Sequence, residues 1–151
     1  YKYCNVTSTG QVGSHSEWPD TDIPFLRLAE VYLNYAEAVK RGGTGGSETD
    51  ALTYVNDLRE RGYGNATGNY DSFSDISLDD LLDERSRELY WEAIRRTDLV
   101  RYGYFTTSAY LWPLKGGVKN GSAVEAYRNL YPIPASDMSV NSNLEQNEGY
   151  R

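Results

Sequence analysis

Four carboxylates lie close together in the sequence, where a pair of acids could catalyse hydrolysis: Asp79, Asp80, Asp83 and Glu84. A retaining glycosidase holds its two carboxyl groups ~5–5.5 Å apart across a cleft, and an inverting glycosidase holds them ~6.5–9.5 Å apart. Acids within one turn of a helix point outward instead, and the helix dipole alone favours acids at an N-terminus. A hydrolase is therefore the weaker hypothesis, and we expect a protein that is not an enzyme.

Other catalytic and cofactor chemistries lack their residues. The sequence has one histidine, His15, and one cysteine, Cys4. These counts exclude a two-histidine metal site, a metal site built on cysteines and an intrachain disulfide. No Gly-x-Ser-x-Gly elbow is present, and the glycine-rich run 42–46 lacks the Lys-Ser/Thr of a phosphate loop. We expect no metal and no cofactor, and we expect Cys4 to be a free thiol that is buried or partly buried.

Aromatic side chains are the best candidates for a binding role. The 14 tyrosines far outnumber the three phenylalanines and three tryptophans, and a tyrosine has an apolar face and a polar tip that suit a binding surface. Such faces stack on the apolar faces of pyranose rings. The candidate carbohydrate-binding residues are Trp112, Tyr110 and Trp18, with Tyr104 near the first two. The alternative is structural, with Trp112 capping the helical core and Trp18 covering it beside Pro19.

Composition limits the remaining classes. The chain of 151 residues favours one domain. Its formal net charge is -7, from 15 basic and 22 acidic side chains, which argues against a nucleic-acid partner because phosphate binding needs a basic surface. No apolar run approaches the ~18–20 residues of a membrane-spanning helix.

The longest helical pattern is predicted to run from Leu78 to Arg101. Ser77 and Asp80 have the spacing of a capping box at its start, and Gly103 follows its last periodic residue. An apolar stripe recurs at helical spacing along it, made of Leu78, Leu82, Leu89, Ala93 and Val100. A continuous helix of this length would be roughly 36 Å long at ~1.5 Å per residue.

Charged residues run beside that stripe: Arg85, Glu88, Glu92, Arg95 and Arg96. Opposite charges three and four residues apart, such as Glu92 and Arg96, stabilise a helix by only ~0.2–0.5 kcal/mol each. One interpretation is a solvated charged face. The other is a half-buried ion-pair ladder that fixes the register of neighbouring elements and contributes specificity more than stability.

Two shorter helices are predicted before the long one, which makes the fold mainly α. The first is capped by Asp22, has Pro24 in its first turn and ends at the glycines of 42–46. Its predicted apolar face consists of Phe25, Leu26, Ala29, Tyr32, Leu33, Tyr35, Ala36 and Val39. The second is capped by Ser47 or Thr49, buries Ala51, Leu52, Val55 and Leu58, and ends at Gly62 and Gly64. A short link between helices of similar length predicts an antiparallel pair.

The rest of the chain is predicted to be irregular. Residues 1–21 form a loop-rich lead-in with a short strand near 2–6, residues 22–103 hold the helices, and residues 104–151 form an irregular tail. A polar loop is expected at 63–76. The two prolines of 131–134 require extended backbone. The final residues form successive turns, with Leu144 and Tyr150 as the apolar anchors.

These segments, in this order and spacing, resemble the C-terminal part of the SusD/RagB family over residues 22–151. The matching segments are FLRLAEVYLNYAEA at 25–38, ALTYVNDLR at 51–59, the run from Glu84 to Gly103, YPIP at 131–134 and NLEQNEGY at 143–150. The run 110–117 is similar to the starch-type branch of the family. Two positions depart from the family pattern: Ala93 stands where many members have glycine, and Glu148 stands where proline is usual.

The resemblance implies a function. Members are lipoproteins on the outer face of the outer membrane that bind glycans, such as starch-like glucans, and pass them to a TonB-dependent transporter of the SusC type. They are not enzymes, and their folds contain tetratricopeptide-like antiparallel helix pairs with a loop-rich C-terminal region. The family chain is longer, with its lipid anchor and main sugar-stacking aromatics upstream of the matching part. We therefore expect a soluble part of a glycan-binding protein, or alternatively a scaffold that contacts the transporter and has no sugar site of its own.

Overall fold

The computed structural model describes residues 4–114 and 117–150. The chain packs as two compact units, one ending at Arg95 and the other beginning at Arg96. The boundary therefore falls inside the segment predicted to be helical, before Gly103. That residues 1–151 make up a single domain of a longer protein stays a prediction.

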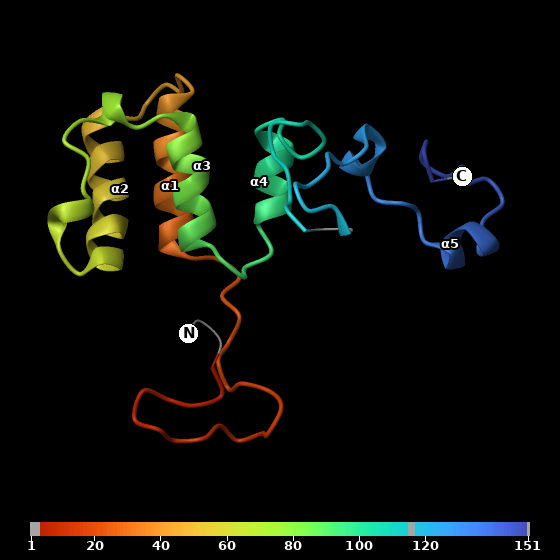
Figure 1. Ribbon diagram of the computed structural model, residues 1–151, viewed down its shortest axis with the longest axis horizontal. Helices are drawn as coiled ribbons and strands as arrows, with labels where there is room; N and C mark the ends of the chain where they lie inside the picture. Colours follow the sequence, from red (N-terminus) through yellow and green to blue (C-terminus); the bar gives the residue numbers. More distant parts are fainter. Residues whose placement is uncertain (1–3, 115–116, 151) are drawn as a thin grey trace. The chain divides into compact units, whose positions relative to one another are not determined.

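Three helices form the first unit: α1 (Leu28–Lys40), α2 (Glu48–Tyr63) and α3 (Leu78–Glu88). α1 contacts both α2 and α3, and the link between α1 and α2 is short, so the predicted antiparallel pair is confirmed (Figure 1). No strand is present in the parts of the chain that the structure describes. The prediction of a mainly α fold is therefore correct.

The core of this unit lies where the three helices meet. Its fully buried side chains come from helical positions spaced three or four residues apart, as the pattern predicted: Leu33 and Ala36 in α1, Ala51 and Val55 in α2, and Leu81 in α3. The loop between α2 and α3 also contributes, because Phe73 and Ile76 are 4% and 1% exposed. The predicted polar loop thus supplies part of the core, and it contains two short 3-10 helices, η1 (Ala66–Gly68) and η2 (Phe73–Asp75).

The first helix begins later than the sequence suggested. Its N-cap is Arg27, in extended conformation, and Asp22 does not cap it. Phe25 and Leu26 are 96% and 81% exposed, so the prediction that they belong to the apolar face was wrong. The side chain of this N-cap residue binds two carboxylates far along the chain, those of Glu88 and Glu92, and a local pattern does not contain such long-range contacts.

The caps of the other two helices match the prediction. The hydroxyl of Ser47 accepts a hydrogen bond from the N–H of Asp50 at 3.0 Å, and Gly64 ends α2 in left-handed conformation. Ser77 and Asp80 form the capping box of α3, each side chain bonded to the other's backbone N–H. These bonds satisfy N–H groups that have no partner within the helix.

The long helix predicted from Leu78 to Arg101 is not continuous. α3 ends at Glu88, and α4 (Arg95–Arg101) begins seven residues later in the numbering. Between them, Trp91 and Ala93 have φ of 65° and 61°, and residues in left-handed conformation cannot propagate a right-handed helix. Leu89 stays buried, but Ala93 is exposed, so the apolar stripe predicted through Ala93 was wrong there.

The second unit is largely irregular, as predicted. Among the described residues, the helical parts of this unit include the rest of α4, the 3-10 helix η4 (Ala126–Asn129) and α5 (Ala135–Val140). Gly103 ends α4 with φ of 74°, and the next two N–H groups, of Tyr104 and Phe105, both donate to the carbonyl of Leu99. The predicted stop at Gly103 is correct.

The N-terminal segment has one isolated antiparallel bridge, between Val6 and Val12. Of the predicted short strand near 2–6, Lys2 and Tyr3 lie outside the described residues, and the described remainder contains only that bridge. Cys4 is exposed, so the expectation of a buried or partly buried thiol was wrong; no segment of the core is folded over it. Among the described residues, no helix is both long and apolar enough to cross a membrane.

Candidate functional site

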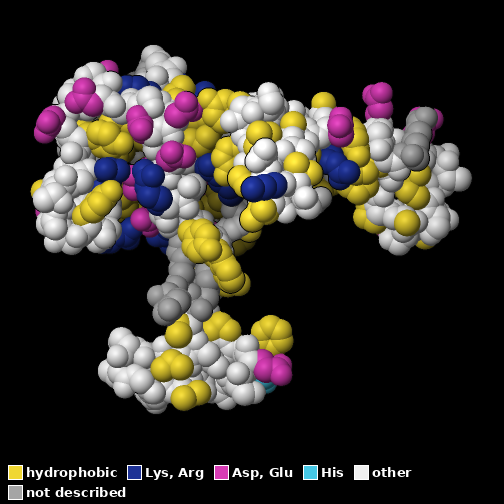
Figure 2. All heavy atoms as spheres, viewed as in Figure 1, with side chains coloured by type: hydrophobic (Ala, Val, Ile, Leu, Met, Phe, Trp, Pro, Cys, Tyr) yellow, Lys and Arg dark blue, Asp and Glu magenta, His cyan; other side chains and the backbone are white. Residues whose placement is uncertain are grey.

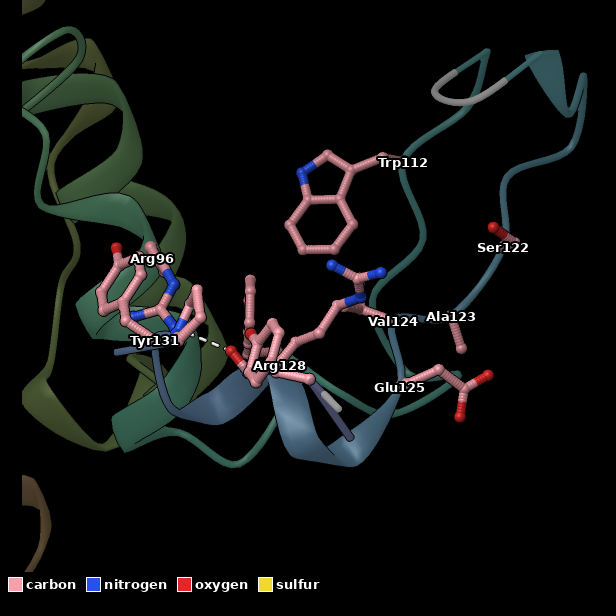
Figure 3. A pocket seen from close by; sticks show the side chains of 11 residues that line it. Arg96, Trp112, Ser122, Ala123, Val124, Glu125, Arg128 and Tyr131 are labelled. Atoms are coloured by element: carbon pink, nitrogen blue, oxygen red, sulfur yellow. Dashed lines mark hydrogen bonds between the residues drawn. The ribbon is translucent and has the colours of Figure 1, made fainter. Parts of the chain in front are cut away.

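A cavity of about 640 Å³ lies within the second unit and combines aromatic and charged side chains. Its walls come from α4, from the loop 105–125, from η4 and from the C-terminal tail (Figure 3). Its aromatic and basic lining residues are Arg96, Phe105, Trp112, Arg128, Tyr131 and Tyr150. We call this cavity the aromatic pocket.

Arg96 holds one wall of the aromatic pocket together. Its guanidinium donates to the carbonyl oxygens of Arg128 at 2.8 Å and Asn129 at 3.2 Å. The same guanidinium lies 4.0 Å from the ring centre of Tyr131 and 4.8 Å from that of Phe105. Both distances are within the range of cation–π attraction. Arg96 therefore fixes η4 and two rings relative to α4.

Trp112 reaches the aromatic pocket from the loop after α4. Its ring packs edge-to-face against Phe105 and Tyr110, with centroid distances of 5.7 Å and 5.1 Å. The structure thus brings together Trp112 and Tyr110, two of the three predicted carbohydrate-binding residues. Tyr110 supports Trp112 without lining the cavity. Tyr104 instead pairs with Tyr102, at 6.3 Å.

Trp18, the third candidate, belongs to the other unit. It is 67% exposed, and its ring centre lies 6.4 Å from that of His15. The alternative interpretation, in which Trp18 covers the core, was wrong because most of the ring faces solvent. A role of Trp18, Tyr110 or Trp112 in sugar binding stays a prediction.

Two charged groups complete the aromatic pocket. Figure 3 shows the side chain of Arg128 extending toward Trp112, and that of Glu125, the N-cap residue of η4, pointing away from Trp112. A guanidinium supplies hydrogen-bond donors and a carboxylate supplies acceptors. Aromatic faces beside such groups can bind a molecule with apolar ring faces and a rim of hydroxyls, which is the chemistry of a carbohydrate.

The backbone of the extended 130–133 segment is held by side chains of the C-terminal tail. Gln146 accepts a hydrogen bond from the N–H of Ile133 at 2.8 Å and donates to its carbonyl at 2.9 Å. Asn147 donates to the carbonyl of Tyr131 at 2.7 Å, and the hydroxyl of Tyr150 donates to the carbonyl of Leu130 at 2.9 Å. We call these three side chains the tail clasp.

The sequence pattern does not predict most of the tail clasp. Tyr150 and Leu144 are predicted as apolar anchors, but Tyr150 also anchors through its hydroxyl, and no pattern marks Gln146 and Asn147. Their only signal is the NLEQNEGY run itself, because side-chain amides in a polar tail have no periodicity. Arg128 and Tyr131 were likewise not predicted to line a pocket.

The two carboxylates of the predicted ion-pair ladder, Glu88 and Glu92, pair with arginines from other parts of the first unit. Arg27 binds Glu88 at 2.8 Å and Glu92 at 2.9 Å, and Glu88 also pairs with Arg61 of α2. The side chains of Glu88 and Glu92 are only 13% and 5% exposed. A wholly solvated face therefore does not describe these two carboxylates, although basic and acidic side chains do intermingle over the helices of this unit (Figure 2).

The three arginines of the predicted ladder contact different parts of the chain. Arg85 is 2% exposed and donates to the side chain of Asn34 at 2.6 Å, and Arg95 donates to the carbonyl of Leu82 at 2.8 Å. Arg96 instead belongs to the aromatic pocket. The helical pair expected between Glu92 and Arg96 requires a continuous helix, which the chain does not form there. That the remaining ladder fixes the register of the helices stays a prediction.

Metal ligands do not gather within the described part of the chain. No group of three or more His, Cys, Asp or Glu side chains there is placed to hold a metal ion.

The chain is similar to known proteins along its whole length. The family model described as the SusD family matches residues 1–150. The starch-binding protein SusD of Bacteroides thetaiotaomicron is 48% identical over 150 residues, which cover 99% of this chain and 25% of that protein. The SusD-like protein P2 of Formosa agariphila is 32% identical over 149 residues, covering 93% of this chain and 28% of that protein.

Solved structures show the same relationship. A SusD superfamily protein from Bacteroides vulgatus aligns with a TM-score of 0.67 and 32% identity, covering 92% of this chain and 31% of that one. Surface glycan-binding protein A from Bacteroides thetaiotaomicron, in complex with laminarihexaose, aligns with a TM-score of 0.68 and 25% identity, covering 92% of this chain and 27% of that one. The chain spans about a quarter of the length of the curated relatives it matches. The family model and these relatives together show that the chain belongs to the SusD family.

Proposed function

We propose that the protein is a non-catalytic glycan-binding component of a cell-surface uptake system and that it binds a glucan. Two observations on relatives support this proposal: one is named as starch-binding, and another was solved with laminarihexaose bound. Starch and laminarihexaose are both polymers or oligomers of glucose. The physical observation that carries the proposal for this chain is the aromatic pocket.

The aromatic pocket has the features that a sugar site requires. Trp112 offers an indole face that its contacts with Phe105 and Tyr110 hold in one orientation. Rings held in this way lose little conformational entropy on binding. Arg128 and Glu125 add a donor and an acceptor for hydroxyl groups. The cavity of about 640 Å³ is within the usual ~300–1,000 Å³ of small-molecule sites.

The proposal extends to partners and location by family membership. We propose that the parent protein is an outer-membrane lipoprotein facing the outside of the cell, and that it passes its glycan to a TonB-dependent transporter. The net charge of -7 gives no support to a nucleic-acid partner.

Affinity gel electrophoresis of the 151-residue chain tests the sugar site. We expect gels that contain amylopectin to retard the chain, and we expect Trp112→Ala to abolish most of the retardation. Gels with laminarin and with no polysaccharide run in parallel. Circular dichroism of each variant shows whether the helices are retained.

Two further variants locate the site. Trp91→Ala removes a tryptophan that is 71% exposed and does not line the aromatic pocket, so it is the matched control and should migrate like the wild-type chain. Trp18→Ala tests the other exposed candidate. Loss of retardation in Trp18→Ala with normal retardation in Trp112→Ala would place the sugar at the N-terminal segment instead.

The second candidate function is a protein–protein scaffold that contacts the transporter and has no sugar site of its own. The observation that favours it is the large exposed apolar area of the first unit, where Phe25 is 96% and Leu26 is 81% exposed. Exposed apolar clusters of this kind mark interaction surfaces. Absence of retardation in every polysaccharide, with the chain folded, would favour the scaffold.

A further inference from the structure

The side chains of the tail clasp hold the wall of the aromatic pocket without contributing all of its surface. Gln146 and Asn147 do not line the cavity, whereas Tyr131, Pro132 and Tyr150 do. Through four hydrogen bonds, the clasp holds backbone groups at three of the four positions from 130 to 133. The C-terminal tail is therefore placed to fix the position of the Tyr131 ring.

Other backbone hydrogen bonds hold the extended segment at its two ends: the N–H of Leu130 donates to the carbonyl of Tyr127, and the carbonyl of Pro134 accepts from the first turn of α5. Between these ends, the tail clasp bonds to the backbone of Tyr131 and Ile133. Pro132 and Pro134 have no backbone N–H to donate, and the Tyr131 side chain is 68% exposed. The Tyr131 ring contacts the guanidinium of Arg96 on one side of the segment. Asn147 fixes the backbone of Tyr131, which carries the ring. The side-chain amide of Gln146 fixes both the N–H and the carbonyl of Ile133, the next residue that is not a proline.

We propose that Gln146 and Asn147 are positioning residues for the glycan site: they set glycan affinity by fixing the backbone that presents Tyr131. This inference rests on the proposed function. Because coupling between two sites is reciprocal, a glycan that binds the aromatic pocket also tightens the clasp. Glycan affinity and the order of the C-terminal tail therefore increase together and decrease together.

Gln146→Ala and Asn147→Ala test the inference by affinity electrophoresis in amylopectin and laminarin. We expect Asn147→Ala, which loses the one hydrogen bond to the Tyr131 carbonyl, to weaken binding by up to about tenfold, and Gln146→Ala, which loses both bonds to Ile133, to weaken it at least as much. Gln146→Glu keeps the acceptor for the Ile133 N–H and loses the donor to its carbonyl, so it should bind with an affinity between those of the wild-type chain and Gln146→Ala.

Asn141→Ala is the matched control. Its side chain accepts a hydrogen bond from the N–H of Asn143, inside the tail, and in the described part of the chain it forms no hydrogen bond with residues 130–133. Like Gln146→Ala, it removes one side-chain amide that bonds to backbone. We expect it to bind amylopectin as tightly as the wild-type chain does. Equal weakening in Asn141→Ala and Gln146→Ala would overturn the inference, because general disorder of the tail would then explain both.

Hydrogen exchange at the Ile133 amide gives a readout that a merely structural role would not move. In the wild-type chain, the bound glycan should slow this exchange by about the factor that the clasp adds to glycan affinity. In Gln146→Ala, the exchange should be fast with and without glycan. Exchange in the wild-type chain that is unaffected by bound glycan would overturn the inference.

The outcomes separate this inference from the proposed function. If Trp112→Ala loses binding and Gln146→Ala binds like the wild-type chain, the sugar site stands and the positioning role fails. If the wild-type chain binds neither glucan, the proposed sugar site fails, and the positioning role fails with it, even where exchange shows that the clasp itself forms.

Discussion

Arg59 on α2 and Glu84 on α3 form an ion pair of 2.7 Å in which the two side chains are only 12% and 10% exposed. The guanidinium of Arg59 also donates to the carbonyl of Gly68 and lies 4.5 Å from the ring centre of Tyr70. One arginine thus ties α3 and the loop 63–76 to α2. This contact joins two helices that both pack against α1.

Arg59→Met should therefore lower the stability of the folded chain strongly. We expect a loss of about 3 kcal/mol in the free energy of unfolding, the low end for a broken buried pair, because Glu84 keeps its second partner, Arg87. Arg87→Met is the matched control, since Arg87 binds the same carboxylate but is 54% exposed. It should cost less than about 1 kcal/mol. Urea denaturation followed by circular dichroism measures both, and equal losses would contradict the importance assigned to burial.

At the break between α3 and α4, replacing an alanine by glycine should not lower stability, in contrast to its usual effect in a helix. Ala93 has φ of 61°, a conformation that costs an L-residue roughly 1–2 kcal/mol. Ala93→Gly should relieve that cost and offset the added entropy of the unfolded chain, so stability should stay equal or rise by up to about 1 kcal/mol.

Ala38→Gly is the control for the break. Ala38 is also exposed but lies within α1, where glycine costs about 1 kcal/mol relative to alanine. The same urea titration compares the two variants. A loss at Ala93 as large as that at Ala38 would mean that residue 93 is in right-handed helical conformation.

The capping box of α3 makes stability depend on pH. Hydrogen bonds from the hydroxyl and the backbone N–H of Ser77 lower the pKa of Asp80 below its ordinary value of 3.8. A lowered pKa in the folded state contributes stability above the unfolded-state pKa, and this contribution is lost as the pH falls through the lowered value.

Asp80→Asn isolates this contribution because asparagine does not titrate. The difference in unfolding free energy between the wild-type chain and Asp80→Asn should be constant from about pH 7 to about pH 5 and should shrink as the pH falls below 3.8. Urea titrations over this range measure it. A difference that is the same at neutral pH and in acid would show that Asp80 acts only as a neutral cap.

Gly149 packs against the ring of Tyr127 and should tolerate no side chain. It has φ of 85°, and a Cβ there would overlap the ring of Tyr127, which packs edge-to-face on Tyr150 at 4.8 Å. Gly103 is the matched control, since its φ of 74° is similar but a Cβ there would meet open space.

Gly103→Ala should cost only the backbone strain, roughly 1–2 kcal/mol. Gly149→Ala should cost more and should change the near-ultraviolet circular dichroism of tyrosine, because the Tyr127 ring must move. Thermal denaturation, followed by the near-ultraviolet circular dichroism of tyrosine, compares the stabilities of the two variants. Identical losses and an unchanged spectrum in Gly149→Ala would contradict the packing described for Tyr127.

Part of the candidate site could be predicted and part could not. Trp112 is a candidate from the sequence because aromatic faces stack on pyranose rings and Trp112 lies with Tyr110 in a glycine-rich loop, with capping of the helical core as the structural alternative. Arg96 was identified as charged and helical, but its contacts with Tyr131 and Phe105 depend on how the chain after α4 folds back. Arg128, Gln146 and Asn147 have no sequence pattern that marks a binding or positioning role.

The sequence by itself determined what depends on neighbours within one or two helical turns. The caps at Ser47 and Ser77 are bonds across three residues, and the buried faces of α1 and α2 follow from apolar residues at helical spacing. Family membership could be inferred in the same way, because the matching segments are local and occur in a fixed order.

Only the tertiary structure decided what depends on distant residues. Arg27 and Glu92 are 65 residues apart in the sequence, yet their ion pair accompanies both the late start of α1 and the end of the helical run after Glu88. Gln146 holds Ile133 across 13 residues of irregular chain. Local propensity is too weak to decide such positions, because contacts between distant segments outweigh the few tenths of a kcal/mol that separate helix from loop at one residue.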